Sequence, residues 1–119
     1  ELVGETAVIN EEQMTSATAL CACGIALFLR AIRAASQGGN EIDFHASEAL
    51  KMAAQTAKGA ACLLIANQSH PEDEIDKVTS PKGCTIAGLN EMEHNGFSSS
   101  FIKGITVSAK QAKGLYLEN

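Results

Sequence analysis

Apolar and small residues recur every three or four positions along most of this chain. The spacing is clearest between residues 49 and 64, and again between Phe97 and Ile105. It matches one face of an amphipathic α-helix and does not match the strict alternation of a strand. The pattern predicts an all-α fold, a bundle of five to six helices over residues 10–119.

Turn residues set the expected boundaries of the first helix. It is expected to begin at Glu11 and to run to about Gln37, with a break near Ala22–Gly24. The pair Gly38-Gly39 is expected to stop it, because glycine is common just past the end of a helix.

Similar signals divide the rest of the chain. Ser69 and Glu72 have the spacing of a capping box, and Pro71 suits the first turn of a short helix that reaches Val78. The other expected helices span residues 45–67, 85–94 and 97–117. Residues 1–9 resemble the end of a strand, which is not stable alone and would belong to a structure upstream.

The composition indicates a domain with a small core. The chain has 119 residues, 45% of them hydrophobic and only 4% aromatic, and much of the apolar content is alanine. Alanine favours helices but buries little surface per residue. This composition favours an oligomer whose subunits share a core.

Charge and hydropathy exclude some classes of partner. The net charge is −5 and no basic stripe is visible, which argues against nucleic-acid binding. The longest apolar run, Ala19–Leu29, ends at Arg30 and is shorter than the roughly 20 residues that span a bilayer. We therefore expect a cytoplasmic protein that does not bind membranes.

The cysteines and histidines lack the spacing of a metal site. Cys21 and Cys23 are two positions apart, so a helix would direct their sulfurs to different faces. We expect reduced thiols that pack as small apolar groups, and no bound metal.

The sequence KVTSPKGCTIAGL, from Lys77 to Leu89, is the candidate binding motif. Ser-Pro-Lys-Gly predicts a turn, and a new helix follows it. The start of a helix carries unpaired amides and a partial positive charge, which suit a carboxylate or phosphate. Hydroxyls of Ser80 and Thr85 would add donors. The simpler alternative is that Ser80 or Thr85 only caps the helix.

The blocks DKVTSPKGCTIAGL, from Asp76 to Leu89, and EHNGF, from Glu93 to Phe97, resemble the C-terminal domain of pyrroline-5-carboxylate reductase. The resemblance implies an enzyme that reduces 1-pyrroline-5-carboxylate to L-proline with NADPH or NADH. It implies two helical domains interlocked as a homodimer, which often assembles further. Residues 1–9 would be the remnant of an upstream dinucleotide-binding domain, and this chain alone would bind no cofactor.

The same resemblance implies the substrate site. The substrate carboxylate would be held by backbone amides and one hydroxyl, from Ser80, Gly83, Cys84 and Thr85. The Val78 carbonyl would face the ring nitrogen of the substrate. No nucleophile is needed, because hydride transfer to an imine depends on the placement of cofactor and substrate.

Two departures from the family pattern keep a second function open. The segment CACGI replaces the usual Ser-Gly-Ser-Gly-Pro, which in the family faces the nicotinamide and the substrate. Lys82 replaces a usual glycine. The expected cofactor-adjacent residues are therefore Cys21, Cys23, Gly24 and Ile25. The alternative is a reductase-like protein with lost or altered chemistry, whose helical domain serves mainly for dimerisation.

Overall fold

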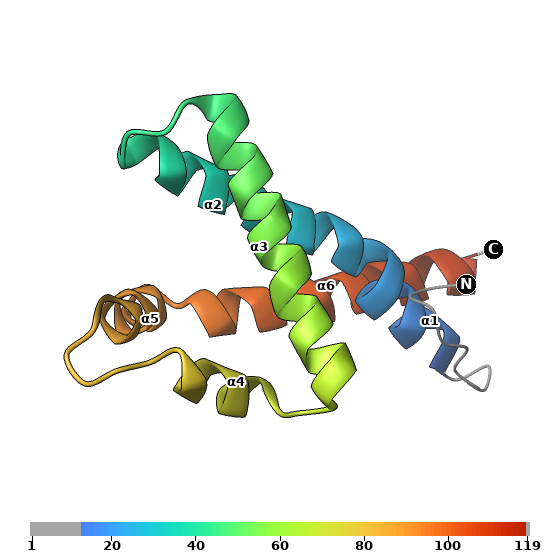
Figure 1. Cartoon of the computed structure of the whole chain (residues 1–119). Coiled ribbons are helices and arrows are strands. Elements are labelled where there is room, and N and C mark those ends of the chain that lie inside the picture. The colour runs from blue at the N-terminus through green and yellow to red at the C-terminus, as the bar shows by residue number, and fades with distance from the viewer. Residues whose placement is uncertain (1–12, 119) are drawn as a thin grey trace. The chain divides into compact units, whose positions relative to one another are not determined.

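A computed structural model describes residues 13–118 of the chain, and within this range every regular element is a helix. This confirms the all-α prediction, while the expected strand at residues 1–9 lies outside the described residues. The elements are α1 (Met14–Ala17), the π-helix η2 (Thr18–Cys23), α2 (Gly24–Glu41), α3 (Ala46–Asn67), α4 (Pro71–Lys77), α5 (Cys84–His94) and α6 (Phe97–Glu118) (Figure 1).

The chain divides into two compact units, and each is described by itself. Among the described residues, one unit contains those up to Leu29 together with those from Ser98 onwards. The other contains Arg30–Phe97, which includes the candidate motif. The long helix α2 therefore contributes its first turns to one unit and its remainder to the other.

The expected break near Ala22–Gly24 is a wider helical turn and not an interruption. Residues 18–23 form a π-helix, and the Gly24 N–H donates to the Ala19 carbonyl five residues earlier. The backbone of Gly24 is right-handed α-helical, so α2 continues directly from η2. A π-helical turn is rare and is frequently found at functional sites.

The prediction that Gly38-Gly39 ends the helix is wrong, because α2 continues to Glu41. A Cβ atom at Gly39 would lie 2.9 Å from the Cβ atom of Ala49 in α3, closer than real side chains approach. Ala49 itself is only 3% exposed. Gly39 therefore permits close packing of α2 against α3. In the sequence, a glycine at such a contact looks the same as a glycine that ends a helix.

The predicted capping box of Ser69 and Glu72 is also wrong. The N-cap of α4 is His70, whose Nδ1 accepts a hydrogen bond from the Glu72 N–H at 3.1 Å. The Ser69 hydroxyl instead donates to Glu74 Oε2 at 2.6 Å. Pro71 does occupy the first turn as expected.

The core of the described residues contains no large apolar side chain. The buried hydrophobic residues are Ala19, Ala49 and Ala112, and the largest fully buried side chain is that of Ser36. In the same part of the chain, sixteen large hydrophobic side chains are at least 42% exposed. A domain of this length ordinarily buries a contiguous apolar core, so exposure of this many large apolar side chains favours their burial against a binding partner.

Three of the exposed apolar residues form a stripe on α2. Ile25, Phe28 and Leu29 are each between 57% and 60% exposed and recur at helical spacing. Within the same unit, the ring of Phe28 lies 5.1 Å from that of Phe101 in α6, with the two planes tilted by 51°. One side of the Phe28 ring is thus packed on α6 while more than half of the residue stays open to solvent.

By length and composition alone, the segment Thr18–Glu41 is apolar enough to cross a membrane. The uninterrupted apolar run Ala19–Leu29 is too short to span a bilayer, but the helix continues past Arg30 to Glu41. A helix that packs against a second protein chain has the same apolar composition.

Candidate functional site

The candidate motif begins where α4 ends. The Ile75 carbonyl accepts hydrogen bonds from the Val78 N–H at 3.1 Å and from the Thr79 hydroxyl at 2.7 Å. The Thr79 N–H donates to the Asp76 carbonyl at 3.3 Å. These bonds fix the backbone of Val78 and Thr79 to the last turn of α4. Within the described residues, the Val78 carbonyl itself accepts no hydrogen bond, so it is available to a ligand.

A tight turn follows, from Ser80 to Gly83. The Gly83 N–H donates to the Ser80 carbonyl at 3.0 Å, which closes the turn. Pro81 fixes its own φ near the value that the second position of such a turn requires. Lys82 has a φ of 59°, in the left-handed region that favours glycine.

Gly83 is held in this turn by close contact. A Cβ atom at this position would lie 3.1 Å from the Ser80 carbonyl oxygen and closer still to the Ser80 hydroxyl oxygen. The Ser80 carbonyl is backbone and cannot rotate away from a larger residue. The turn therefore requires glycine for space, although the φ of Gly83 is −78° and suits any residue.

Helix α5 begins directly after the turn, with Gly83 as its N-cap and no side-chain cap. Its first helical bond is made by the Ala87 N–H to the Gly83 carbonyl at 3.4 Å. The amides of Cys84, Thr85 and Ile86 have no helical partner, and no side chain of the described residues accepts from them. This helix start thus offers three unpaired donors in one direction, together with the positive end of the dipole.

The geometry changes two details of the predicted site. The Gly83 amide, expected to bind a carboxylate, donates within the turn instead. The Ile86 amide, which was not predicted, is one of the unpaired donors; counting four unpaired amides from the helix start would have identified it.

Neither hydroxyl of the motif caps α5. The hydroxyls of Ser80 and Thr85 make no hydrogen bond to any residue that the structure describes. Cys84 is exposed and its thiol is free. The capping alternative therefore does not account for the two hydroxyl residues, and they remain available beside the unpaired amides.

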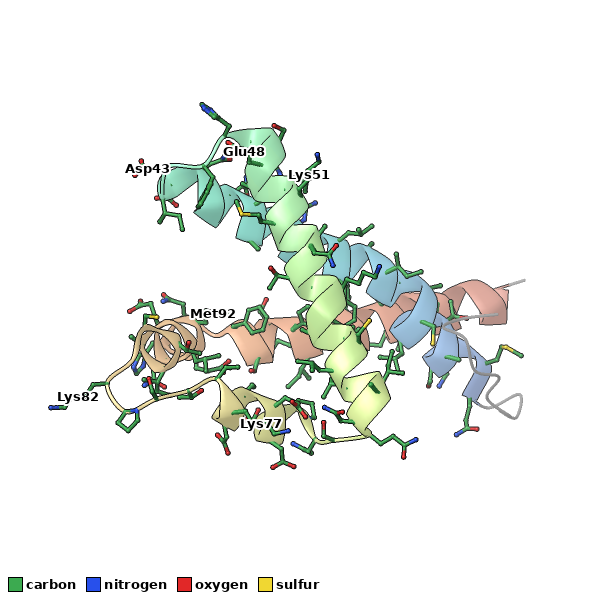
Figure 2. The ribbon with its side chains drawn as sticks, in the orientation of Figure 1. Asp43, Glu48, Lys51, Lys77, Lys82 and Met92 are labelled. Carbon is green, nitrogen blue, oxygen red and sulfur yellow. The ribbon has the colours of Figure 1, made fainter. Side chains whose placement is uncertain are left out.

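Lys82 extends away from the loop between α4 and α5 and does not point back over the start of α5 (Figure 2). The structure thus gives no support for a direct contact between this lysine and a ligand at the amides. What distinguishes the position is its backbone, since a residue with a Cβ atom in the left-handed region is strained by about 1–2 kcal/mol.

Replacing Lys82 by glycine is expected to stabilise the protein by about 0.5–1 kcal/mol. The strain relieved exceeds the extra chain entropy that glycine loses on folding, which is about 0.5–1 kcal/mol. Urea unfolding of both proteins at one fixed protein concentration measures the difference. Lys82→Ala is the control, because it removes the charge but keeps the strain. An equal gain from Lys82→Ala would show that charge, not backbone strain, is responsible.

The expected cofactor-adjacent residues belong to the other unit. Cys21 and Cys23 are half-buried in η2 with free thiols, Gly24 is buried, and Ile25 is 60% exposed. These residues supply thiols and an apolar surface but no charged group. They could contact a flat ring but could not bind the phosphates of a nucleotide.

Comparison with known proteins places the chain in a family. Residues 11–115 match the family model described as pyrroline-5-carboxylate reductase dimerisation. Pyrroline-5-carboxylate reductase 1 of Dictyostelium discoideum is 66% identical over 116 residues, which is 98% of this chain but 21% of that protein.

Two solved structures share the fold. The 1-pyrroline-5-carboxylate reductase of Streptococcus pyogenes has a TM-score of 0.88 at 32% identity, covering 93% of this chain and 43% of that one. The Plasmodium falciparum pyrroline carboxylate reductase, solved with NADP bound, has a TM-score of 0.84 at 24% identity, covering 89% and 40%. The chain thus spans less than half the length of these relatives. It belongs to the pyrroline-5-carboxylate reductase dimerisation family.

Proposed function

We propose that this chain is the C-terminal domain of an enzyme that reduces 1-pyrroline-5-carboxylate to L-proline, and that it supplies both the dimer interface and the site for the substrate carboxylate. The observation that carries the substrate site is the set of unpaired amides of Cys84, Thr85 and Ile86 beside the free Thr85 hydroxyl. Family membership supports this reading of the site over a generic anion site.

Each part of the motif has a role in this proposal. The substrate carboxylate accepts hydrogen bonds from the start of α5, from the Thr85 hydroxyl and from the Ser80 amide. The Val78 carbonyl accepts a hydrogen bond from the protonated imine nitrogen, which places a partial negative charge beside the iminium. The two contacts together orient the ring and keep the imine protonated for reduction.

The nicotinamide cofactor, NADPH or NADH, supplies the hydride that adds to the imine carbon when it is bound. The residues of this chain that would face its nicotinamide ring are Cys21, Cys23, Gly24 and Ile25, and their apolar character fits an uncharged ring. The phosphates would be held by a dinucleotide-binding domain preceding this chain, because these four residues offer no cation. A cytoplasmic location is part of the same proposal.

The exposed stripe on α2 supports a homodimer formed through the long helices α2 and α6. Among the residues that the structure describes, the buried hydrophobic ones are all alanines, which remove little apolar surface from water to offset the loss of chain entropy on folding. A second copy that covers Ile25, Phe28 and Leu29 would supply the missing core. Dimers would then assemble further as the family resemblance implies.

A chimeric reductase tests the catalytic part of the proposal. The chimera is the Dictyostelium discoideum enzyme with its 116 matched residues replaced by this chain. Oxidation of NADPH and of NADH is measured with 1-pyrroline-5-carboxylate as substrate. Turnover near that of the parent is expected. A folded, dimeric chimera without turnover would favour the alternative, a helical domain that serves for dimerisation alone.

Replacing Thr85 by alanine in the chimera is expected to raise the KM for 1-pyrroline-5-carboxylate about 5- to 150-fold. This range corresponds to the loss of about 1–3 kcal/mol from one hydrogen bond to a charged group. Thr85→Ser keeps the hydroxyl and is expected to restore most of the affinity. Equal KM values for wild type, Thr85→Ala and Thr85→Ser would exclude a role of this hydroxyl in binding.

A further inference from the structure

Glu74 in α4 lies in an unusual environment for an acidic residue. No step of the proposed reaction uses this residue. Its side chain is only 12% exposed, whereas that of Lys77, one turn later, is 64% exposed. A carboxylate withdrawn from water in this way must be hydrogen-bonded to offset its lost hydration. The Glu74 carboxylate therefore requires hydrogen-bond donors, and three are present.

All three partners donate to the same carboxylate oxygen, Oε2. The Ser69 hydroxyl donates at 2.6 Å, the Asn67 amide nitrogen at 3.3 Å and the Lys77 ammonium at 3.3 Å. Asn67 is the last residue of α3 and Ser69 lies in the corner before α4. Glu74 thus links the end of α3 to the middle of α4 across the corner of the chain.

The charged form of Glu74 is the one that this arrangement favours. The hydrogen bond from Ser69, followed by that from Asn67, lowers the pKa of Glu74 below its ordinary value, and Lys77 lowers it further. The link is therefore intact at neutral pH and is lost only as the pH falls through this lowered pKa.

The link made by Glu74 affects the position of the backbone at the C-terminal end of α4. Ile75, the residue after Glu74, provides the carbonyl that accepts from both the Val78 N–H and the Thr79 hydroxyl. A helix of seven residues has too few internal bonds to hold its own last turn. What holds α4 in place therefore also determines where the Val78 carbonyl lies.

We infer that Glu74 is a positioning residue, which holds α4 against the end of α3 and thereby fixes the Val78–Thr79 backbone of the substrate site. The inference rests on the proposed function for its effect on catalysis, but the link itself is a property of this fold. In this inference, Ser69 is the main hydrogen-bond partner of Glu74 and not the cap of α4.

The test uses Glu74→Ala, Ser69→Ala and the double variant in the chimeric reductase. Each single variant is expected to raise the KM for 1-pyrroline-5-carboxylate about 10-fold and to leave kcat and the KM for NADPH within about twofold. The double variant is expected to match Glu74→Ala, because the Ser69 hydroxyl has no carboxylate to bond once Glu74 is replaced. Glu72→Ala, which removes an exposed carboxylate from the same helix, is the control and should change neither KM.

Hydrogen exchange separates this inference from the proposed function. In Glu74→Ala, the Val78 and Thr79 amides are expected to exchange about 10-fold faster, while the Ala49 amide of α3 keeps its rate. Unchanged exchange at Val78 and Thr79 would overturn the inference whatever the activity. Faster exchange with an unchanged substrate KM would overturn the positioning role. If the wild-type chimera shows no turnover, the proposed function fails and the exchange rates alone decide the link.

Discussion

Replacing Leu29 by aspartate is expected to weaken the proposed homodimer at least about 100-fold in Kd. Leu29 is 58% exposed in the single chain and lies on the apolar stripe of α2. In a symmetric dimer each substitution occurs twice, so two leucine contacts are lost and two carboxylates are placed against apolar surface. Sedimentation analysis of wild type and variant across a range of concentrations measures the change.

The control for this experiment carries the same charge on the same helix. Gln37→Asp introduces a carboxylate at an exposed position of α2 outside the apolar stripe. It is expected to leave the dimer constant within about threefold, since an exposed charge is well solvated. A Leu29→Asp protein that remains a dimer at the lowest concentrations would mean that another face of the chain forms the interface.

Replacing Gly83 by alanine is expected to raise the KM for 1-pyrroline-5-carboxylate about 100-fold or more. The added Cβ would crowd both the hydroxyl and the carbonyl of Ser80, so the turn must open. Opening it moves the start of α5 relative to Val78, and displacements of about 1 Å at a binding site can cost about 100-fold. Steady-state kinetics of the chimeric reductase measures this effect.

A second glycine of the same helix provides the matched control. A Cβ atom at Gly88 would meet no atom of the described residues within 4 Å. Gly88→Ala is therefore expected to leave KM unchanged and to stabilise α5 by roughly 0.5–1 kcal/mol. If Gly83→Ala also left KM unchanged, the tight turn would not be part of the substrate site.

The helices could be predicted from the sequence where local signals determine them. The start of α3 after His45 and the end of α5 at Asn95, followed by Gly96 with a φ of 81°, follow the expected pattern. The all-α class follows from helical periodicity, which needs no knowledge of tertiary contacts.

The misjudged positions are those at which a residue outside the local motif determines the role of the side chain or backbone. Gly39 looks like a helix stop, but its role is set by Ala49, ten positions later. Ser69 looks like a cap, but its hydroxyl is used by Glu74. A short sequence motif does not show that a residue outside it packs against the glycine or accepts the hydroxyl's hydrogen bond.

The turn and the helix start of the candidate site were predictable from the sequence, but their hydrogen bonds were not. The turn and the unpaired amides follow from Ser-Pro-x-Gly ahead of a helix. The use of the Gly83 amide within the turn, and the outward direction of Lys82, depend on backbone angles that the sequence does not specify.

The π-helical turn of η2 marks a place where the chain can lose one residue without a change of helical phase. A π-turn holds one residue more than an α-turn, so deleting any one residue between Thr18 and Cys23 would let ordinary α-helical bonding resume. The α-turn completes about the same rotation with one residue fewer, so α1 would keep its orientation around the helix axis. The same deletion within α2 would instead rotate α1 by about 100° and draw it in by about 1.5 Å.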